Sequence, residues 1–237
     1  MFSRTSRTLK YALAGAALAA MSGTAMADVV VTASHGAAAR DYPRGTRLRD
    51  NQSVTLGSGS VVTVLTDSGT RRWRGPGRFS ASQGRQAGGS LNASSNVRAG
   101  ITRGPDSPFP GVWDVVANED GPFCYATGAA VGIWRPTNQT DQMVTITGPN
   151  GQSETVTIGT DFYSVAWPVT VAAVDGAEYR VQLQGEEPVT VHFVELDTDS
   201  EDRIDVAAAL GSQECFSQLQ TLADMIDESG EADASSD

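Results

Sequence analysis

Histidine and cysteine, the side chains that most often serve as base and nucleophile, are scarce in this sequence. Its 237 residues include only two histidines, His35 and His192, and two cysteines. A serine or cysteine hydrolase needs a base, usually histidine, held by a third group. His35 falls in a small-residue loop and His192 on the polar side of a strand-like segment, so we interpret both as solvated surface residues. The sequence contains no GxGxxG, GxxxxGK(S/T), GxSxG or HExxH motif, so the common nucleotide, hydrolase and zincin signatures are absent.

The acidic run between Glu195 and Asp205 is the candidate cation site. Its carboxylates include Asp197, Asp199, Glu201 and Asp202, and calcium prefers oxygen ligands. The EF-hand spacing is not met, because there is no glycine at the sixth position. We therefore predict a solvated acidic loop that caps a helix. Two cysteines and two histidines also exclude a Cys-rich zinc module. We expect no metal, no cofactor and no catalytic residue.

An arginine cluster around Trp73 is the candidate ligand surface. Strand alternation would put Arg72 and Arg74 on one face and Arg71 with Trp73 on the other. An outward arginine face suits phosphate or uronate groups. The alternatives are a solvated outer β face and a face covered by the acidic second half. The full candidate anion-binding face is Arg44, Arg47, Arg49, Arg71, Arg72, Arg74 and Arg78.

The first 27 residues have the pattern of a signal peptide. A basic region with Arg4, Arg7 and Lys10 precedes a short apolar run, and Ala25-Met26-Ala27 supplies small residues for cleavage before Asp28. No later apolar stretch reaches the length that a membrane span requires. We therefore predict a soluble, exported, periplasmic protein cleaved between Ala27 and Asp28.

The two halves of the remaining chain carry opposite charge. Residues 28–103 have 11 arginines and four acidic residues, whereas residues 104–237 have three arginines and 24 acidic residues. The halves could dock on each other, the basic half could bind an anionic partner, or the difference could lie only in solvated faces. Between them lie a Gly/Ser-rich stretch and the Pro-rich segment 104–111, which we interpret as an extended, exposed linker.

The basic half (28–103) is predicted to be all-β, because β-branched residues dominate and no helical apolar period occurs. We expect its strands at Val29–Thr32, Ser53–Leu56, Ser60–Thr66 and Thr70–Arg74, the last one ended by Gly75-Pro76-Gly77.

A family resemblance rests on the turn glycines and alternating apolar residues of this half. The runs Tyr42-Pro-Arg-Gly-Thr-Arg-Leu, Val54-Thr-Leu-Gly-Ser-Gly-Ser-Val-Val-Thr-Val-Leu and Gly69-Thr-Arg-Arg-Trp-Arg-Gly-Pro-Gly resemble a FecR-type domain. With the second half included, the chain is similar to uncharacterised periplasmic proteins of alphaproteobacteria. The resemblance implies a β fold and an envelope setting, and it implies no catalytic residue.

The acidic second part (112–227) is predicted to be a β-sandwich followed by helices. Seven short segments alternate with period two, and Gly148-Pro149-Asn150-Gly151 and Asp175-Gly176 have turn composition. The expected strands are Phe123–Ala126, Ala130–Trp134, Met143–Thr147, Glu154–Ile158, Tyr163–Ala173, Glu178–Leu183 and Val189–Leu196.

The end of the chain is predicted to form two helices and an unstructured tail. A helix from Asp202 to Leu210 would end at Gly211, and Ser212 would cap a second helix reaching about Asp227. On that helix Cys215, Leu219, Leu222 and Ile226 share one face. Residues 228–237 form an acidic tail that we expect to be disordered.

The two cysteines predict a Cys124–Cys215 disulfide, because both belong to the second half of an exported protein. A reactive thiol is the alternative, but both cysteines lie in acidic sequence, which disfavours a thiolate.

The fold class is thus mainly β: a small FecR-like β domain, then a β-sandwich with a C-terminal helical segment. We predict a non-catalytic, exported envelope interaction or scaffold protein that acts through protein–protein contacts. The alternative is a module that binds an anionic polymer or glycan through its arginine-rich face. An enzyme is the third hypothesis.

Overall fold

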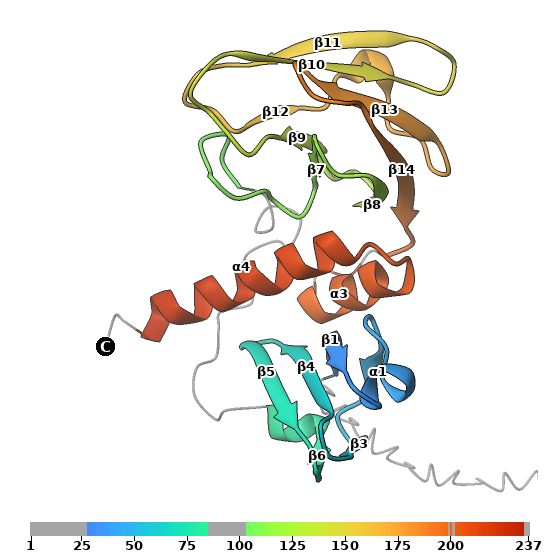
Figure 1. Ribbon diagram of the computed structural model, residues 1–237, viewed down its shortest axis with the longest axis vertical. Coiled ribbons are helices and arrows are strands. Elements are labelled where there is room, and N and C mark those ends of the chain that lie inside the picture. The colour runs from blue at the N-terminus through green and yellow to red at the C-terminus, as the bar shows by residue number, and fades with distance from the viewer. Residues whose placement is uncertain (1–27, 85–102, 199, 201, 235–237) are drawn as a thin grey trace, which may run out of the picture.

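The protein is built in three layers, with two β modules separated by the C-terminal helices (Figure 1). The computed structural model describes residues 28–84, 103–198, 200 and 202–234. The predicted signal segment and most of the Gly/Ser-rich stretch lie outside these residues. The chain is mainly β with a short C-terminal helical segment, as predicted. Within the described ranges, no helix is long and apolar enough to cross a bilayer.

The first module packs a four-stranded sheet against a two-stranded sheet of β3 and β6. The larger sheet has the order β2-β1-β4-β5. Its inner face contributes Val62, Val64 and Trp73 to a core that also contains Val54 and Leu56 of β3. The elements are β1 (Val29–His35), α1 (Ala38–Asp41), β2 (Arg47–Leu48), β3 (Ser53–Leu56), β4 (Val61–Thr66), β5 (Gly69–Arg74), β6 (Gly77–Ser80) and η1 (Ala81–Gly84).

The four strands predicted in this module are all present, but α1, β2 and β6 were not predicted. Gly75-Pro76-Gly77 does end β5, as expected, yet the chain turns there and immediately starts β6, which pairs with β3. Phe79 of β6 stacks on Trp73 with ring centroids 5.7 Å apart. A four-residue strand next to two glycines is too short for periodicity to reveal.

The second module is a β-sandwich. A five-stranded sheet of order β11-β10-β13-β14-β8 faces a three-stranded sheet of order β12-β9-β7, and aromatic contacts among Trp167, Tyr179 and Phe193 fill the space between them. The elements are β7 (Asp114–Val116), β8 (Gly121–Ala126), β9 (Gly132–Trp134), β10 (Gln142–Thr147), β11 (Ser153–Ile158), β12 (Ser164–Ala166), η2 (Val169–Val171), β13 (Glu178–Leu183) and β14 (Val189–Leu196).

One expectation for this region was wrong. The predicted strand Tyr163–Ala173 is only β12, because Pro168 has no N–H to continue a ladder and the chain turns into η2. The segment 104–111 is exposed in part but it is not independent of the sandwich. The carbonyl of Pro105 accepts hydrogen bonds from the N–H groups of Tyr163 and Ser164, at 2.6 and 3.1 Å.

The helical layer consists of α3 (Arg203–Ser212) and α4 (Phe216–Ala234). Asp202 caps α3 as predicted, accepting hydrogen bonds from the N–H groups of Ile204 and Asp205. However, Gly211 does not end α3, and the Ser212 hydroxyl donates to the Ala209 carbonyl inside α3 instead of capping α4.

The predicted disordered tail from residue 228 is also a helix as far as Ala234. Glu228 accepts a hydrogen bond of 2.7 Å from Arg103, and the apolar face that ends at Ile226 anchors the preceding turns. A helix already nucleated by packing extends at low cost through the alanine- and glutamate-containing sequence that follows. Residues 235–237 lie outside the described part of the chain.

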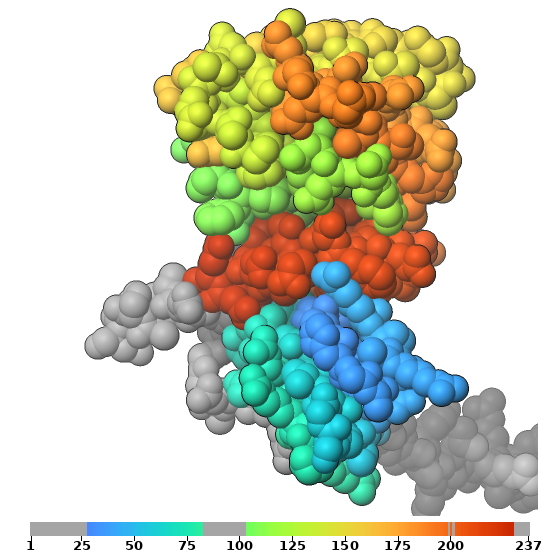
Figure 2. All heavy atoms as spheres, viewed as in Figure 1, coloured from blue at the N-terminus to red at the C-terminus, as the bar shows by residue number. Residues whose placement is uncertain are grey.

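One apolar core joins all three layers. Leu219, Leu222 and Ile226 of α4 are buried on the predicted face, and Val30 and Leu65 of the first module pack into the same cluster. Space-filling atoms show the helices as a continuous band between the modules (Figure 2). The halves therefore dock through apolar burial, with charge pairs at the edges.

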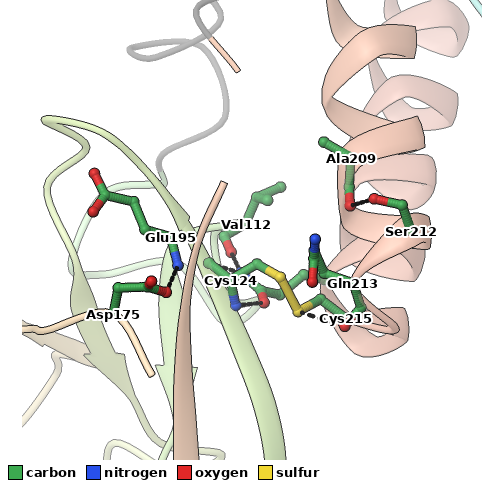
Figure 3. The surroundings of a disulfide bond; sticks show 9 residues. Val112, Cys124, Asp175, Glu195, Ala209, Ser212, Gln213 and Cys215 are labelled. Carbon is green, nitrogen blue, oxygen red and sulfur yellow. Dashed lines mark hydrogen bonds between the residues drawn. A yellow bond between two sulfur atoms is a disulfide. The ribbon is translucent and has the colours of Figure 1, made fainter. Parts of the chain in front are cut away.

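The disulfide joins the helical layer to the sandwich. Cys124 in β8 and Cys215, just before α4, are bonded with a Cα–Cα distance of 6.0 Å, which confirms the predicted pairing (Figure 3). Beside it, the buried amide of Gln218 accepts from Cys124 N–H at 2.6 Å and donates to the Cys124 and Val112 carbonyls at 2.6 and 2.7 Å. Because β8 is the edge of its sheet, this amide satisfies backbone groups that no strand covers.

Gly211 brings α3 against the first module. A Cβ on Gly211 would collide with the backbone of Gly45, and one on Gly45 would lie 2.6 Å from the Gly211 carbonyl oxygen. A Gly-to-Ala change inside a helix ordinarily stabilises it by about 1 kcal/mol. We expect Gly211→Ala to do the opposite here and lower the free energy of unfolding by about 2 kcal/mol, because the two backbones must separate.

Urea denaturation checks this prediction, and the neighbouring Ser212→Ala should change stability by less than about 0.5 kcal/mol. A Gly211→Ala protein as stable as the unmodified chain would show that the close approach of α3 and Gly45 does not matter.

Candidate functional site

The seven arginines of the candidate anion-binding face do not form one surface. Arg44 and Arg47 lie where the first module meets the helices, and Arg78 lies on β6. Arg72 and Arg74 lie on the outer face of the four-stranded sheet, which is the face opposite the inner core that contains Trp73. The structure therefore divides the predicted face.

Arg44 holds the start of α4. Its guanidinium donates a 2.7 Å hydrogen bond to the Phe216 carbonyl and lies 5.0 Å from the centre of the Phe216 ring. Burial lowers the pKa of Arg44 because desolvation disfavours its charged form. This side chain is committed to the contact between the halves.

Arg47 forms ion pairs with two acidic residues. It lies 2.6 Å from Asp28 and 2.7 Å from Asp205 of α3. Burial by itself would lower the pKa of Arg47, but the hydrogen bonds to the two carboxylates outweigh it and raise that pKa. Both side chains of the Arg47–Asp205 pair are partly exposed, so the pair orients α3 more than it stabilises the protein.

Arg72 and Arg74 extend from the edge strand β5 into solvent. Trp73 between them is buried, in agreement with the predicted alternation. Arg72 is directly opposite Thr63, which pairs with Ala33, and Arg74 is opposite Val61, which pairs with His35. Side chains opposite each other in antiparallel strands share a face. Each arginine therefore lies on the same face of the sheet as its partners on β4 and β1, in one of two parallel rows across these strands.

No ion pair or hydrogen bond of the Arg72 or Arg74 side chain occurs within the described ranges. Successive residues on one face of a strand lie about 7 Å apart. The two guanidinium groups therefore form a compact positive pair that internal docking leaves exposed.

The remaining arginines lie elsewhere. Arg78 pairs with Thr55, and because Val54 and Phe79 face the inner core, Arg78 points away from the four-stranded sheet on the opposite side of the module. Arg49 lies in the turn before β3 and is exposed. Arg71 is half-buried on β5 and already interacts with another group.

A groove of about 650 Å³ lies beside these rows. One wall is the end of β1 with α1, the floor is the exposed side of α4, and the other wall is the segment around β7 of the second module. Its lining includes His35 and Arg44 on the first wall, Ser217 and Thr221 on α4, and Glu119 opposite. The predicted surface histidine His35 is exposed as expected, and so is His192 on β14.

The acidic run caps a helix, as predicted. Asp202 caps α3, and Asp205 accepts a 2.7 Å hydrogen bond from Ser200 while also pairing with Arg47. Asp199 and Glu201 lie outside the described residues. In the part of the chain that the structure describes, no three His, Cys, Asp or Glu side chains form a cluster suited to a metal ion.

Two buried polar residues were missed by the sequence analysis. Arg135 is 1% exposed and donates to the carbonyls of Thr140, Gly159 and Phe162 at 2.6 to 3.1 Å. Burial lowers its pKa, with Asp141 acting in the opposite direction. Gln218 carried a detectable signal, because helical spacing places it on the buried face with Leu222, where an amide is unexpected.

The chain was compared with protein-family models, curated proteins and solved structures, and none of them matches it.

Proposed function

We propose that this protein is an exported, non-catalytic interaction protein of the cell envelope, which binds an anionic partner through Arg72 and Arg74. The observation that carries the proposal is the exposure of this arginine pair on the outer face of the four-stranded sheet. Fixed positive charge on a rigid strand attracts anions and orients them through the planar guanidinium groups.

The export part of the proposal is supported by the signal-like first 27 residues and by the Cys124–Cys215 disulfide, since such bonds persist in oxidising compartments. The scaffold part is supported by the shared core of the three layers. Because the modules cannot move apart without exposing that core, the arginine pair keeps a fixed position relative to the acidic sandwich. The partner is then another envelope protein or, as the second candidate, an anionic polymer.

The test compares two double charge reversals in the full mature chain. Arg72→Glu/Arg74→Glu removes the proposed contact, and Arg49→Glu/Arg78→Glu makes the same charge change away from it. We expect the unmodified protein and the second variant to be retained by an immobilised bacterial envelope fraction at low salt, and the first variant to be released.

The slope of binding against the logarithm of salt concentration should fall by about one for each arginine lost from the contact. Prior protease treatment of the envelope fraction distinguishes a protein partner from a polymer. Equal retention of both double variants would contradict the proposal.

A further inference from the structure

The groove and the arginine pair belong to one surface. Ala33 and His35 line the groove, and the strand pairings place them in the same rows as Arg72 and Arg74. Two strand spacings, about 10 Å in total, separate β1 from β5. The helices cover part of this face of the four-stranded sheet. The part that they leave exposed extends from the groove beside β1 to the two guanidinium groups on β5.

The groove is lined by groups that form hydrogen bonds with hydroxyls. Ser217, Gln220 and Thr221 project from α4, and Ser34 and Thr32 lie on β1. Ser217 and Gln220 are exposed, and their hydroxyl and amide groups offer donors and acceptors to a sugar. Alanine, proline and valine side chains supply apolar contacts between these polar groups.

We propose that this composite surface binds an extended, carboxylate-bearing glycan. The sugar hydroxyls contact the groove, and the carboxylates lie on Arg72 and Arg74, whose forked donors match them. Glu119 on the opposite wall repels carboxylates and so favours the orientation in which they face β5. This inference rests on the proposed function and selects its second candidate, an anionic polymer, as the partner.

The concave shape favours a chain over a folded acidic protein. A convex protein surface can reach Arg72 and Arg74, but it leaves the groove between the modules empty. An extended polysaccharide can occupy the groove and continue across the sheet to the arginines. Because α4 comes from the acidic half of the chain and β1 from the basic half, neither half alone holds this site.

Isothermal titration of the full mature chain with hexagalacturonate tests the inference. We expect binding that weakens with salt, and a dimer of the same sugar that binds more weakly because it cannot span the surface. Arg72→Glu/Arg74→Glu should weaken hexamer binding by at least about tenfold. The matched Arg49→Glu/Arg78→Glu variant should weaken it by less than about threefold, since salt screens exposed charges that lie away from the contact.

A groove variant separates a glycan from a simple polyanion. Ser217→Leu/Thr221→Leu changes two partly or fully exposed helix positions and should weaken hexagalacturonate binding by about fivefold or more while leaving polyphosphate and poly-glutamate unaffected. Circular dichroism melts confirm that each variant is folded.

Absence of hexagalacturonate binding would overturn the glycan inference, and so would equal affinity for polyphosphate with no effect of the groove variant. In either case, envelope binding that is still lost in Arg72→Glu/Arg74→Glu would leave the proposed function standing. Envelope binding that survives this double change would overturn both.

Discussion

Replacing both cysteines, as Cys124→Ala/Cys215→Ala, is expected to lower the free energy of unfolding by about 4–5 kcal/mol. The bonded residues are 91 positions apart, and in the chain-entropy model a loop of that length gives a cross-link this much stabilisation by restricting the unfolded chain. A domain is typically stable by only about 5–15 kcal/mol, so the loss is a large fraction of the total. Urea denaturation under oxidising conditions measures it.

Reduction provides the control for this prediction. Dithiothreitol should destabilise the unmodified protein by a similar amount and should leave the double variant unchanged. A loss smaller than about 1 kcal/mol would mean that the apolar contacts of α4 already fix the helical layer and that the cross-link adds little.

The second large effect is expected at Arg135. Arg135→Met keeps an apolar stem of similar length but leaves the carbonyls of Thr140, Gly159 and Phe162 without their donor. Unsatisfied buried acceptors cost about 1–3 kcal/mol each, and water can reach some of them, so we expect a loss of about 3 kcal/mol. Urea denaturation and limited proteolysis within residues 135–163 report on it.

Arg180→Met is the matched control, because Arg180 is an exposed arginine on β13 of the same module. It should change stability by less than about 0.5 kcal/mol. If the two methionine variants proved equally stable, the hydrogen bonds of Arg135 would be dispensable and the loops it joins would be held by other contacts.

Features encoded locally were predictable from the sequence. Most strands follow from alternation of β-branched residues, and the helical face with Leu219, Leu222 and Ile226 follows from its spacing. The disulfide followed from counting cysteines in a chain whose first 27 residues predict export. The cap at Asp202 followed from residue type. Each of these depends on neighbours in sequence or on very few alternatives.

Features that depend on contacts between distant segments were not predictable in this way. Nothing near Gly211 in the sequence shows that the backbone of Gly45 will lie against it. Likewise, the partners of Arg135 are carbonyls in two later loops. Every residue has a backbone carbonyl, so the sequence does not reveal which ones accept these hydrogen bonds. The separation of the arginines was unpredictable for the same reason. Arg74 and Arg78 are close in sequence but belong to strands of different sheets, which pair with distant segments.

The shared middle layer has a consequence for the order in which the protein is completed. Val30 and Leu65 are made early during synthesis, but the helices that cover them lie much later in the chain, at residues 203–234. Contacts between residues so far apart in sequence form late and slowly. Until α3 and α4 are made, the face of the first module that they cover presents apolar surface to water, so a chain that stops before α3 is expected to aggregate.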